Sequence, residues 1–243
     1  MTLRQAQGPH FMIELLQNSN FLIGSPDAID ALKTKHQARL LTVSDCHGQW
    51  RGLIRIIKQF GPTCDALLLL GDCWRDLQEL LELANEKEEL CAQVPPVIAF
   101  VRGNGDPSSF PVCYDIGRAN PNARTLPKGT VLVPEQLLIE VNGHKILMAH
   151  GHMQGVDYGY NKLGLDAKLH GAKTALHGHT HIPVFEQRGD FTFINPGSTS
   201  RPRGGSPASF AILTVEDKFI DAAFLRINDP FGEDGSYEIF NPY

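Results

Sequence analysis

Three short apolar runs, alternating with stretches of helical spacing, constrain the fold of this chain more than any other feature. The runs lie at residues 40–44, 66–70 and 97–101, and helical patterns occupy 48–60 and 76–91 between them. Strands that are apolar throughout and separated by helices are typical of a parallel sheet covered on both faces. This part of the chain is therefore predicted to be α/β.

Further along the chain the pattern changes to hairpins. Asn142-Gly143 separates apolar runs at Gln136–Val141 and His144–Ala149, which is a strong signal for a two-residue turn. The remaining expected elements are a helix at 160–170, a strand at Thr174–Leu176, and strand pairs at 184–187 with 191–194 and at 210–215 with 219–225.

The expected domain organisation is simple, because no internal repeat or linker interrupts the pattern. We predict an N-terminal extension at 1–38 and a single domain at 39–243. Within the extension, Ser25 is expected to cap a helix that has Pro26 at its first position. A stretch at 105–130 is rich in Pro, Gly and Asn and is expected to be a functional loop that shapes a pocket, and the last fifteen residues are expected to wrap the surface.

Composition limits the partners and the compartment. A formal net charge of −5 argues against a nucleic-acid-binding surface, which usually carries a basic stripe. No apolar stretch approaches the roughly 18–20 residues of a membrane helix, and the first twenty residues do not resemble a signal peptide. Five cysteines without paired spacing are expected to be reduced thiols. We therefore expect a cytoplasmic protein without a membrane partner.

Candidate metal ligands follow five of the expected strands, where the carboxyl ends of strands form active sites in open α/β sheets. Taken singly, each has an ordinary explanation, since an Asp caps helices, an Asn forms turns and a His lies in a loop. Five coincidences favour a metal site instead. Carboxylate and amide oxygens combined with imidazoles suit Mn, Fe, Ni or Zn rather than Ca. The candidates are Asp45, His47, Asp72, Asn104, His150, His179 and His181.

The order of these motifs resembles the calcineurin-like metallophosphoesterases, and within them the small bacterial and archaeal phosphodiesterases related to YfcE. The resemblance spans about residues 40 to 226 and implies a four-layer α/β/β/α sandwich in which two mixed sheets are flanked by helices. The motifs that carry it are Asp-x-His, Gly-Asp, Gly-Asn-x-Asp, His-Gly-His and Gly-His-Thr-His, followed by Ile-Asn-Pro-Gly-Ser at 194–198 and Arg-Pro-Arg-Gly-Gly at 201–205.

The resemblance further implies two divalent metal ions, with Mn expected and Fe, Ni or Zn as alternatives. Asp45, His47, Asp72 and His181 would bind one ion, and Asp72, Asn104, His150 and His179 the other, with Asp72 as the bridge. A hydroxide held between the ions would attack phosphorus in a phosphodiester or an activated phosphomonoester. Asp72, Asn104, His150 and His152 are the expected catalytic residues, and Ser198, Arg201 and Arg203 the expected substrate contacts.

Gly105 departs from the family pattern, because many members carry His at this place and use it in leaving-group chemistry. General acid catalysis is typically worth about 10²–10⁴-fold, and Gly cannot supply it. We therefore predict activity on aryl or otherwise activated diesters and weak activity on simple monoesters. His152 is an alternative proton donor, although an ordinary surface role fits it too.

Two other functional readings compete with this prediction. The protein Ser/Thr phosphatase or dinucleoside polyphosphate hydrolase branch of the superfamily is disfavoured. Its members are expected to carry Gly-Asp-x-x-Asp-Arg-Gly, whereas residues 71–77 of this chain read Gly-Asp-Cys-Trp-Arg-Asp-Leu. A non-catalytic scaffold like the retromer subunit Vps29 is the alternative of a different class, but here every ligand position is filled. The expected partner is a small phosphate-ester substrate, with a homo-oligomer as a further expectation.

Overall fold

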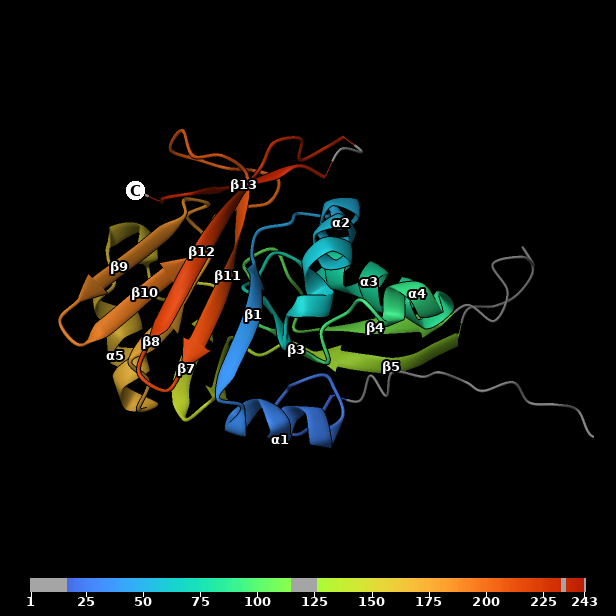
Figure 1. Cartoon of the computed structure of the whole chain (residues 1–243), viewed down its shortest axis with the longest axis horizontal. Coiled ribbons are helices and arrows are strands. Elements are labelled where there is room, and N and C mark those ends of the chain that lie inside the picture. Colours follow the sequence, from blue (N-terminus) through green and yellow to red (C-terminus); the bar gives the residue numbers. More distant parts are fainter. Residues whose placement is uncertain (1–16, 115–125, 233–234, 243) are drawn as a thin grey trace, which may run out of the picture.

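Two β-sheets packed face to face form the centre of the molecule (Figure 1). The computed structural model describes residues 17–114, 126–232 and 235–242. The six-stranded sheet has the order β13 (Tyr237–Phe240), β12 (Ile220–Ile227), β11 (Ser209–Glu216), β1 (Gln37–Val43), β2 (Ala66–Leu69), β3 (Val97–Phe100). The five-stranded sheet has the order β6 (Gln136–Val141), β7 (His144–Ala149), β8 (Thr174–Leu176), β10 (Phe191–Asn195), β9 (Val184–Arg188).

Helices cover the outer face of each sheet. The helices α2 (Trp50–Phe60), α3 (Trp74–Glu86) and α4 (Glu88–Cys91) lie on the six-stranded sheet, and α5 (Asn161–Leu169) lies on the other (Figure 1). The alternation of side chains along each strand separates the layers. In β2, Leu67 and Leu69 pack toward α2 and α3, whereas Leu68 packs between the sheets. The expected four-layer α/β/β/α sandwich is confirmed.

Strand direction decides where the polar loops meet. The strands β1, β2 and β3 are parallel, with Val43 opposite Leu69 and Leu69 opposite Phe100. Their carboxyl ends therefore lie in one row. In the second sheet β7 and β8 are also parallel, with Met148 opposite Leu176. Antiparallel pairing of β11 with β1 and of β6 with β7 makes both sheets mixed, as the family resemblance implied.

Part of the expected N-terminal extension belongs to the packed core. The helix α1 (Pro26–Thr34) begins as predicted, since Ser25 Oγ accepts a hydrogen bond from the Ala28 N–H at 3.2 Å. Ile29 and Leu32 are buried in the cluster between the sheets. The expected division at residue 38 falls inside β1, because the strand begins at Gln37, three residues before the apolar run.

Three expectations are corrected by the structure. The stretch at 105–130 contains two paired strands, β4 (Ser109–Tyr114) and β5 (Leu126–Leu132); residues 115–125, in its middle, lie outside the described residues. Its Pro and Gly residues suggested a loop and obscured the strand pattern, in which the apolar residues Phe110, Val112 and Val131 are buried. The end of the chain extends the sheet as β13 instead of wrapping the surface. The helix expected at 76–91 is broken at Lys87, whose backbone is extended.

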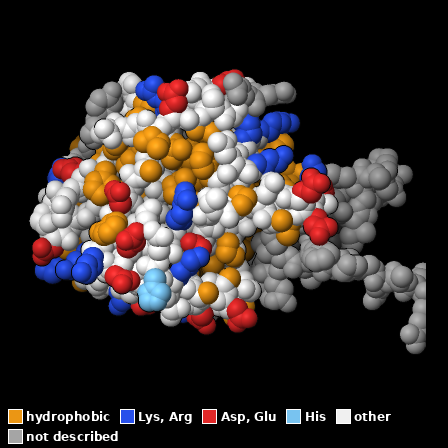
Figure 2. Space-filling view, viewed as in Figure 1, with side chains coloured by type: hydrophobic (Ala, Val, Ile, Leu, Met, Phe, Trp, Pro, Cys, Tyr) orange, Lys and Arg blue, Asp and Glu red, His pale blue; other side chains and the backbone are white. Residues whose placement is uncertain are grey.

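The charges on the surface and the length of the helices can be compared with the expectation of neither a nucleic-acid partner nor a membrane partner. On the face in Figure 2, basic and acidic side chains are interspersed, with no stripe of one sign. Among the described residues, none of the helices is both long enough and apolar enough to cross a membrane.

Candidate metal centre

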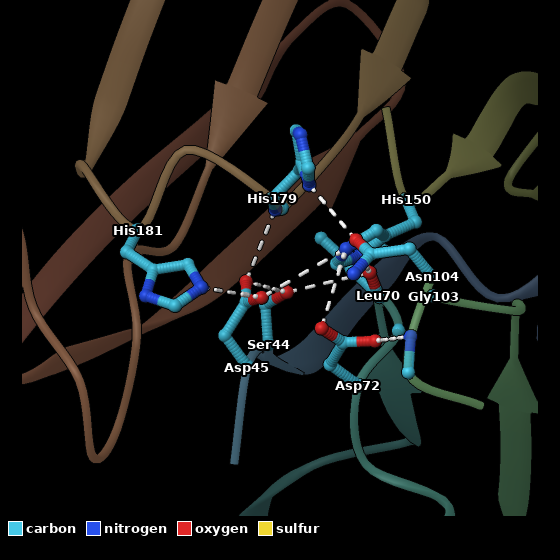
Figure 3. Close-up of polar contacts among 12 residues, drawn as sticks. Ser44, Asp45, Leu70, Asp72, Gly103, Asn104, His150, His179 and His181 are labelled. Carbon is cyan, nitrogen blue, oxygen red and sulfur yellow. Dashed lines mark hydrogen bonds and ion pairs between the residues drawn. The ribbon is translucent and has the colours of Figure 1, made fainter. Parts of the chain in front are cut away.

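The predicted ligands converge at the row of strand ends, on loops with strained backbone (Figure 3). Seven described residues other than glycine have a positive φ, and five of them are predicted ligands. Left-handed conformations of this kind cost about 1–3 kcal/mol each and cluster at functional sites. The five are Asp45 (φ 54), His47 (φ 49), Asp72 (φ 53), His179 (φ 66) and His181 (φ 60).

Asp45 lies at the centre of this cluster and is fully buried. Its Oδ1 is 3.0 Å from His181 Nε2, 3.8 Å from His47 Nε2 and 3.9 Å from His150 Nε2. Its Oδ2 accepts hydrogen bonds from Ser44 Oγ at 2.6 Å and from the His179 N–H at 3.1 Å. Burial raises the pKa of Asp45, but His181, His150 and Ser44 together outweigh burial, so the pKa lies below its ordinary value.

Asp72 faces the same space from the next loop. Its Oδ1 accepts a hydrogen bond from the Gly105 N–H at 2.7 Å, and its Oδ2 is 3.8 Å from His150 Nε2 and 3.9 Å from His47 Nδ1. Two sets of donor atoms, in each of which all atoms lie within 4.8 Å of one another, follow from these positions. Asp45, His47 and His181 form the first set, and Asp45, Asp72 and His150 form the second. Asp45 is common to both, whereas the resemblance implies Asp72 as the bridge.

Backbone carbonyls orient two of the histidines toward the carboxylates. Nδ1 of His150 donates to the Leu70 carbonyl at 2.6 Å, and Nδ1 of His181 donates to the Arg201 carbonyl at 2.6 Å. Because a carbonyl only accepts, each ring carries its proton on Nδ1 and keeps the Nε2 lone pair for a ligand. Among the described residues, His150 Nε2 is buried without a hydrogen-bond partner. This is the orientation of metal-binding imidazoles.

Asn104 and His179 lie on the open side of the cluster (Figure 3). The Asn104 side chain is exposed, and its Oδ1 is 3.1 Å from Nδ1 of His179. All seven predicted ligands thus lie around one site. Oxygen and imidazole donors, together with a buried nitrogen that lacks a partner, fit borderline divalent cations. Which residues bind which ion stays a prediction.

A small cavity of about 240 Å³ opens beside the carboxylates. Arg201 is exposed and lines this cavity, whereas Arg203 is exposed and is not among the lining residues. Contact of either arginine with substrate stays a prediction. The lining residues are His47, Gly48, Asp72, Trp74, Arg75, Asp76, Gly105, Asp106 and Arg201. A substrate phosphate at Asp72 would therefore meet a guanidinium group, which binds phosphoryl oxygens well.

Ser198 requires a correction. It was expected to contact substrate, but its side chain is 0 % exposed. Its hydroxyl donates to the Asp45 carbonyl at 2.8 Å and accepts from the Arg201 N–H at 2.8 Å. Ser200 Oγ donates to the same carbonyl at 3.2 Å. Ser198 therefore supports the strained Asp45 loop from behind.

Two further histidines lie beside the centre. The ring of His152 is 5.4 Å from that of His150, and burial together with the nearby His150 lowers the pKa of His152. This shift favours the neutral form. His177, which is not among the predicted ligands, is fully buried, and burial lowers its pKa to about 4.

Two buried carboxylates hold the ligand loops and were missed in the sequence. Asp106 accepts hydrogen bonds from the backbone N–H groups of Asp72 at 2.6 Å, Gly103 at 2.8 Å and Trp74 at 3.1 Å. Asp76 accepts from the Gly48 N–H at 3.0 Å, and burial raises the pKa of Asp76 to about 7. Asp106 is the final residue of Gly-Asn-x-Asp, so the motif itself carried the signal. Asp76 stands in none of the motifs singled out.

The sequence family agrees with this geometry. The profile of the calcineurin-like phosphoesterase superfamily domain matches residues 39–218, and the chain belongs to that family. The chain is 32 % identical over 187 residues to phosphodiesterase YfcE of Escherichia coli (strain K12), covering 72 % of this chain and 86 % of that protein. It is 36 % identical over 195 residues to the probable metallophosphoesterase YsnB of Bacillus subtilis (strain 168), covering 80 % and 93 %.

Solved structures share the fold. A predicted phosphoesterase from Streptococcus pneumoniae TIGR4 aligns with a TM-score of 0.55 and 25 % identity, over 84 % of this chain and 97 % of the other. Vacuolar Protein Sorting 29 from Cryptosporidium parvum aligns with a TM-score of 0.57 and 17 % identity, over 85 % and 97 %. At that identity the second likeness shows the fold alone. The chain is thus a phosphoesterase-family protein of the metallophosphoesterase fold.

Proposed function

We propose that this protein is a phosphodiesterase that depends on two divalent metal ions, with Mn²⁺ as the preferred ion and Fe, Ni or Zn as alternatives. The observation that carries the proposal is the convergence of two donor sets on Asp45, one with His47 and His181 and the other with Asp72 and His150. The name of the relative YfcE supports the phosphodiester as substrate class.

The chain's own residues divide the work. Two bound divalent cations would supply a water nucleophile that is active near neutral pH and would offset charge on phosphorus. Asp45 and Asp72 would supply the negative charge that holds the ions, and His150 lies with them in one buried cluster. Asn104 and His179 would complete the binding site on its solvent side. Arg201, at the edge of the cavity, neutralises the substrate phosphate. Small phosphate esters of the cell interior are the expected substrates.

Leaving-group chemistry limits the substrate. Gly105 lies beside Asp72 but offers only its N–H, which already binds Asp72 Oδ1. His152 is the remaining candidate donor, but burial and the nearby His150 lower its pKa, which disfavours the protonated form that an acid needs. Aryl and other good leaving groups need no protonation. The proposed activity is therefore strongest on activated diesters and weak on alkyl monophosphates.

The test is hydrolysis of an aryl phosphodiester by protein that has been stripped with a chelator and then loaded with Mn²⁺. Activity should require the ion and should disappear in Asp72→Ala, together with the ion held by Asp45, Asp72 and His150. Asp190→Ala serves as a matched control for the loss of one carboxylate, because Asp190 lies in the exposed turn between β9 and β10. Retained activity in Asp72→Ala would contradict the proposal. So would efficient hydrolysis of simple alkyl monophosphates by the wild type.

The alternative is a non-catalytic scaffold, because Vps29 proteins share this fold. The complete set of ligands and their strained loops argue for the enzyme, since a scaffold gains nothing from the cost of that strain. A protein that binds no Mn²⁺ and hydrolyses none of the cyclic nucleotides, aryl diesters and monoesters in a panel would favour the scaffold.

A further inference from the structure

The two nitrogens of the His179 ring face different oxygen atoms. Nδ1 lies 3.1 Å from Asn104 Oδ1, on the side of the metal centre, and Nε2 lies 3.0 Å from the Asp157 carboxylate Oδ2. His150 and His181 are arranged the other way, with Nδ1 bound to a backbone carbonyl and Nε2 turned to the carboxylates. Of these three rings, only His179 is held from behind by a side chain.

We propose that Asp157 is a positioning residue for the metal centre, which fixes the ring and the proton of His179 so that Nδ1 serves as the metal ligand. The inference rests on the proposed function. With a cation at Asn104 Oδ1, Nδ1 must offer its lone pair, so the ring proton belongs on Nε2. Asp157 is the acceptor for that proton. A carboxylate behind a ligating histidine also makes the imidazole a stronger donor.

A short, anchored turn delivers Asp157 to this place. It lies in the 3₁₀ turn η2 (Val156–Tyr158), after the loop that follows β7. Val156 is buried, and its N–H donates to the Gly151 carbonyl at 3.2 Å. A side chain at Gly151 would meet Val156 Cγ2 at 2.7 Å, so the turn packs tightly against the His150 loop. The backbone under Asp157 is therefore held, while its side chain remains 45 % exposed.

The partial exposure makes the proposal testable, because replacement of Asp157 leaves no buried group unpaired. Loss of a carboxylate behind a metal-bound histidine typically costs 10- to 100-fold in affinity. Asp157→Ala should weaken binding of the ion at Asp72, Asn104, His150 and His179 by roughly this factor. Binding of the ion at Asp45, His47 and His181 should be unchanged. Asp157→Asn should be intermediate, because its amide oxygen still accepts from Nε2 but carries no charge.

The experiment is calorimetric titration of the chelator-treated full chain with Mn²⁺, alongside thermal unfolding of the metal-free protein. Asp190→Ala, in the exposed turn between β9 and β10, is the control for loss of one charge. Two ions bound by Asp157→Ala as tightly as by the wild type would overturn the inference. Equal weakening of both ions, or a metal-free melting temperature well below that of Asp190→Ala, would also overturn it. A wild type that binds fewer than two ions would instead sink the proposed function.

Discussion

Asp45 and His181 meet with 3.0 Å between Oδ1 and Nε2, and the other nitrogen of His181 donates to the Arg201 carbonyl at 2.6 Å. One side chain thus links the loop after β1 to the segment that carries the cavity-edge arginine. Ser198 repeats the link, since its hydroxyl joins the Asp45 carbonyl to the Arg201 N–H. The predicted metal ligands and the proposed phosphate contact are therefore connected by direct hydrogen bonds.

The shared position of Asp45 predicts unequal effects of ligand loss. Asp45→Asn should weaken both ions by more than the 10- to 100-fold that follows loss of an outer partner. His47→Ala should weaken only one, because Asp45, Asp72 and His150 remain. Equilibrium dialysis with Mn²⁺ counts the ions retained by each variant. Two ions retained by Asp45→Asn would show that Asp72 alone bridges them.

Gly105→His should improve catalysis on poor leaving groups. A Cβ at this position would lie 3.1 Å from Asp72 Oδ1 and 3.4 Å from its Cγ, so a side chain fits after a shift of a few tenths of an ångström. A restored acid should raise kcat/KM for an alkyl phosphodiester by about 10²-fold and change an aryl diester much less.

The matched control for Gly105→His is Gly105→Ala, which adds the Cβ without the imidazole. Steady-state kinetics of all three proteins on both esters provide the measurement. An equal change on alkyl and aryl esters would show that the histidine acts through the metal ligands rather than as an acid.

Asp76 predicts a stability that falls as pH rises. Burial raises its folded-state pKa to about 7 from an ordinary value of 3.8. Between these pH values Asp76 keeps its proton in the folded protein but has lost it in the unfolded chain. The stability that this proton contributes is therefore fully present below pH 3.8 and is lost as the pH rises through 7. The limiting slope is about 1.4 kcal/mol per pH unit.

Urea unfolding of metal-free wild type and Asp76→Asn from pH 5 to 8 tests this slope. The Asn oxygen still accepts from the Gly48 N–H but does not titrate, so the difference in free energy of unfolding should shift in favour of the variant as pH rises. If the free energies of unfolding of the two proteins changed with pH in parallel, Asp76 would not be protonated in the folded protein at these pH values.

Ser198→Ala should lower the free energy of unfolding by about 1–2 kcal/mol, because the partly buried Arg201 N–H loses its acceptor and the buried Asp45 carbonyl loses one of two donors. Ser206→Ala is the matched control. Its hydroxyl is also buried but has no hydrogen-bond partner among the described residues, so its loss should cost little. Chemical denaturation measures both, and equal losses would contradict the supporting role of Ser198.

Local patterns in the sequence determined the layers and the ligand set. The continuous apolar run of β2 predicted a strand covered on both faces, and Leu67 and Leu69 do pack on one face and Leu68 on the other. Each predicted ligand followed an apolar run. Both signals are local, because side-chain direction repeats every two residues along a strand and each motif is a few residues long. The same local character explains the failures: Pro and Gly hid β4 and β5, and no periodicity marked the extended Lys87.

Tertiary structure alone decided how the loops support one another. The pairing of Asp157 with His179 and the burial of Ser198 join segments with no shared motif. The elevated pKa of Asp76 likewise depends on how deeply α3 buries its first turn. The sequence predicts which groups bind metal, because the ability to bind a cation belongs to the side chain itself. Which ring nitrogen faces the site, and which group holds it there, depends on distances that only the packed fold establishes.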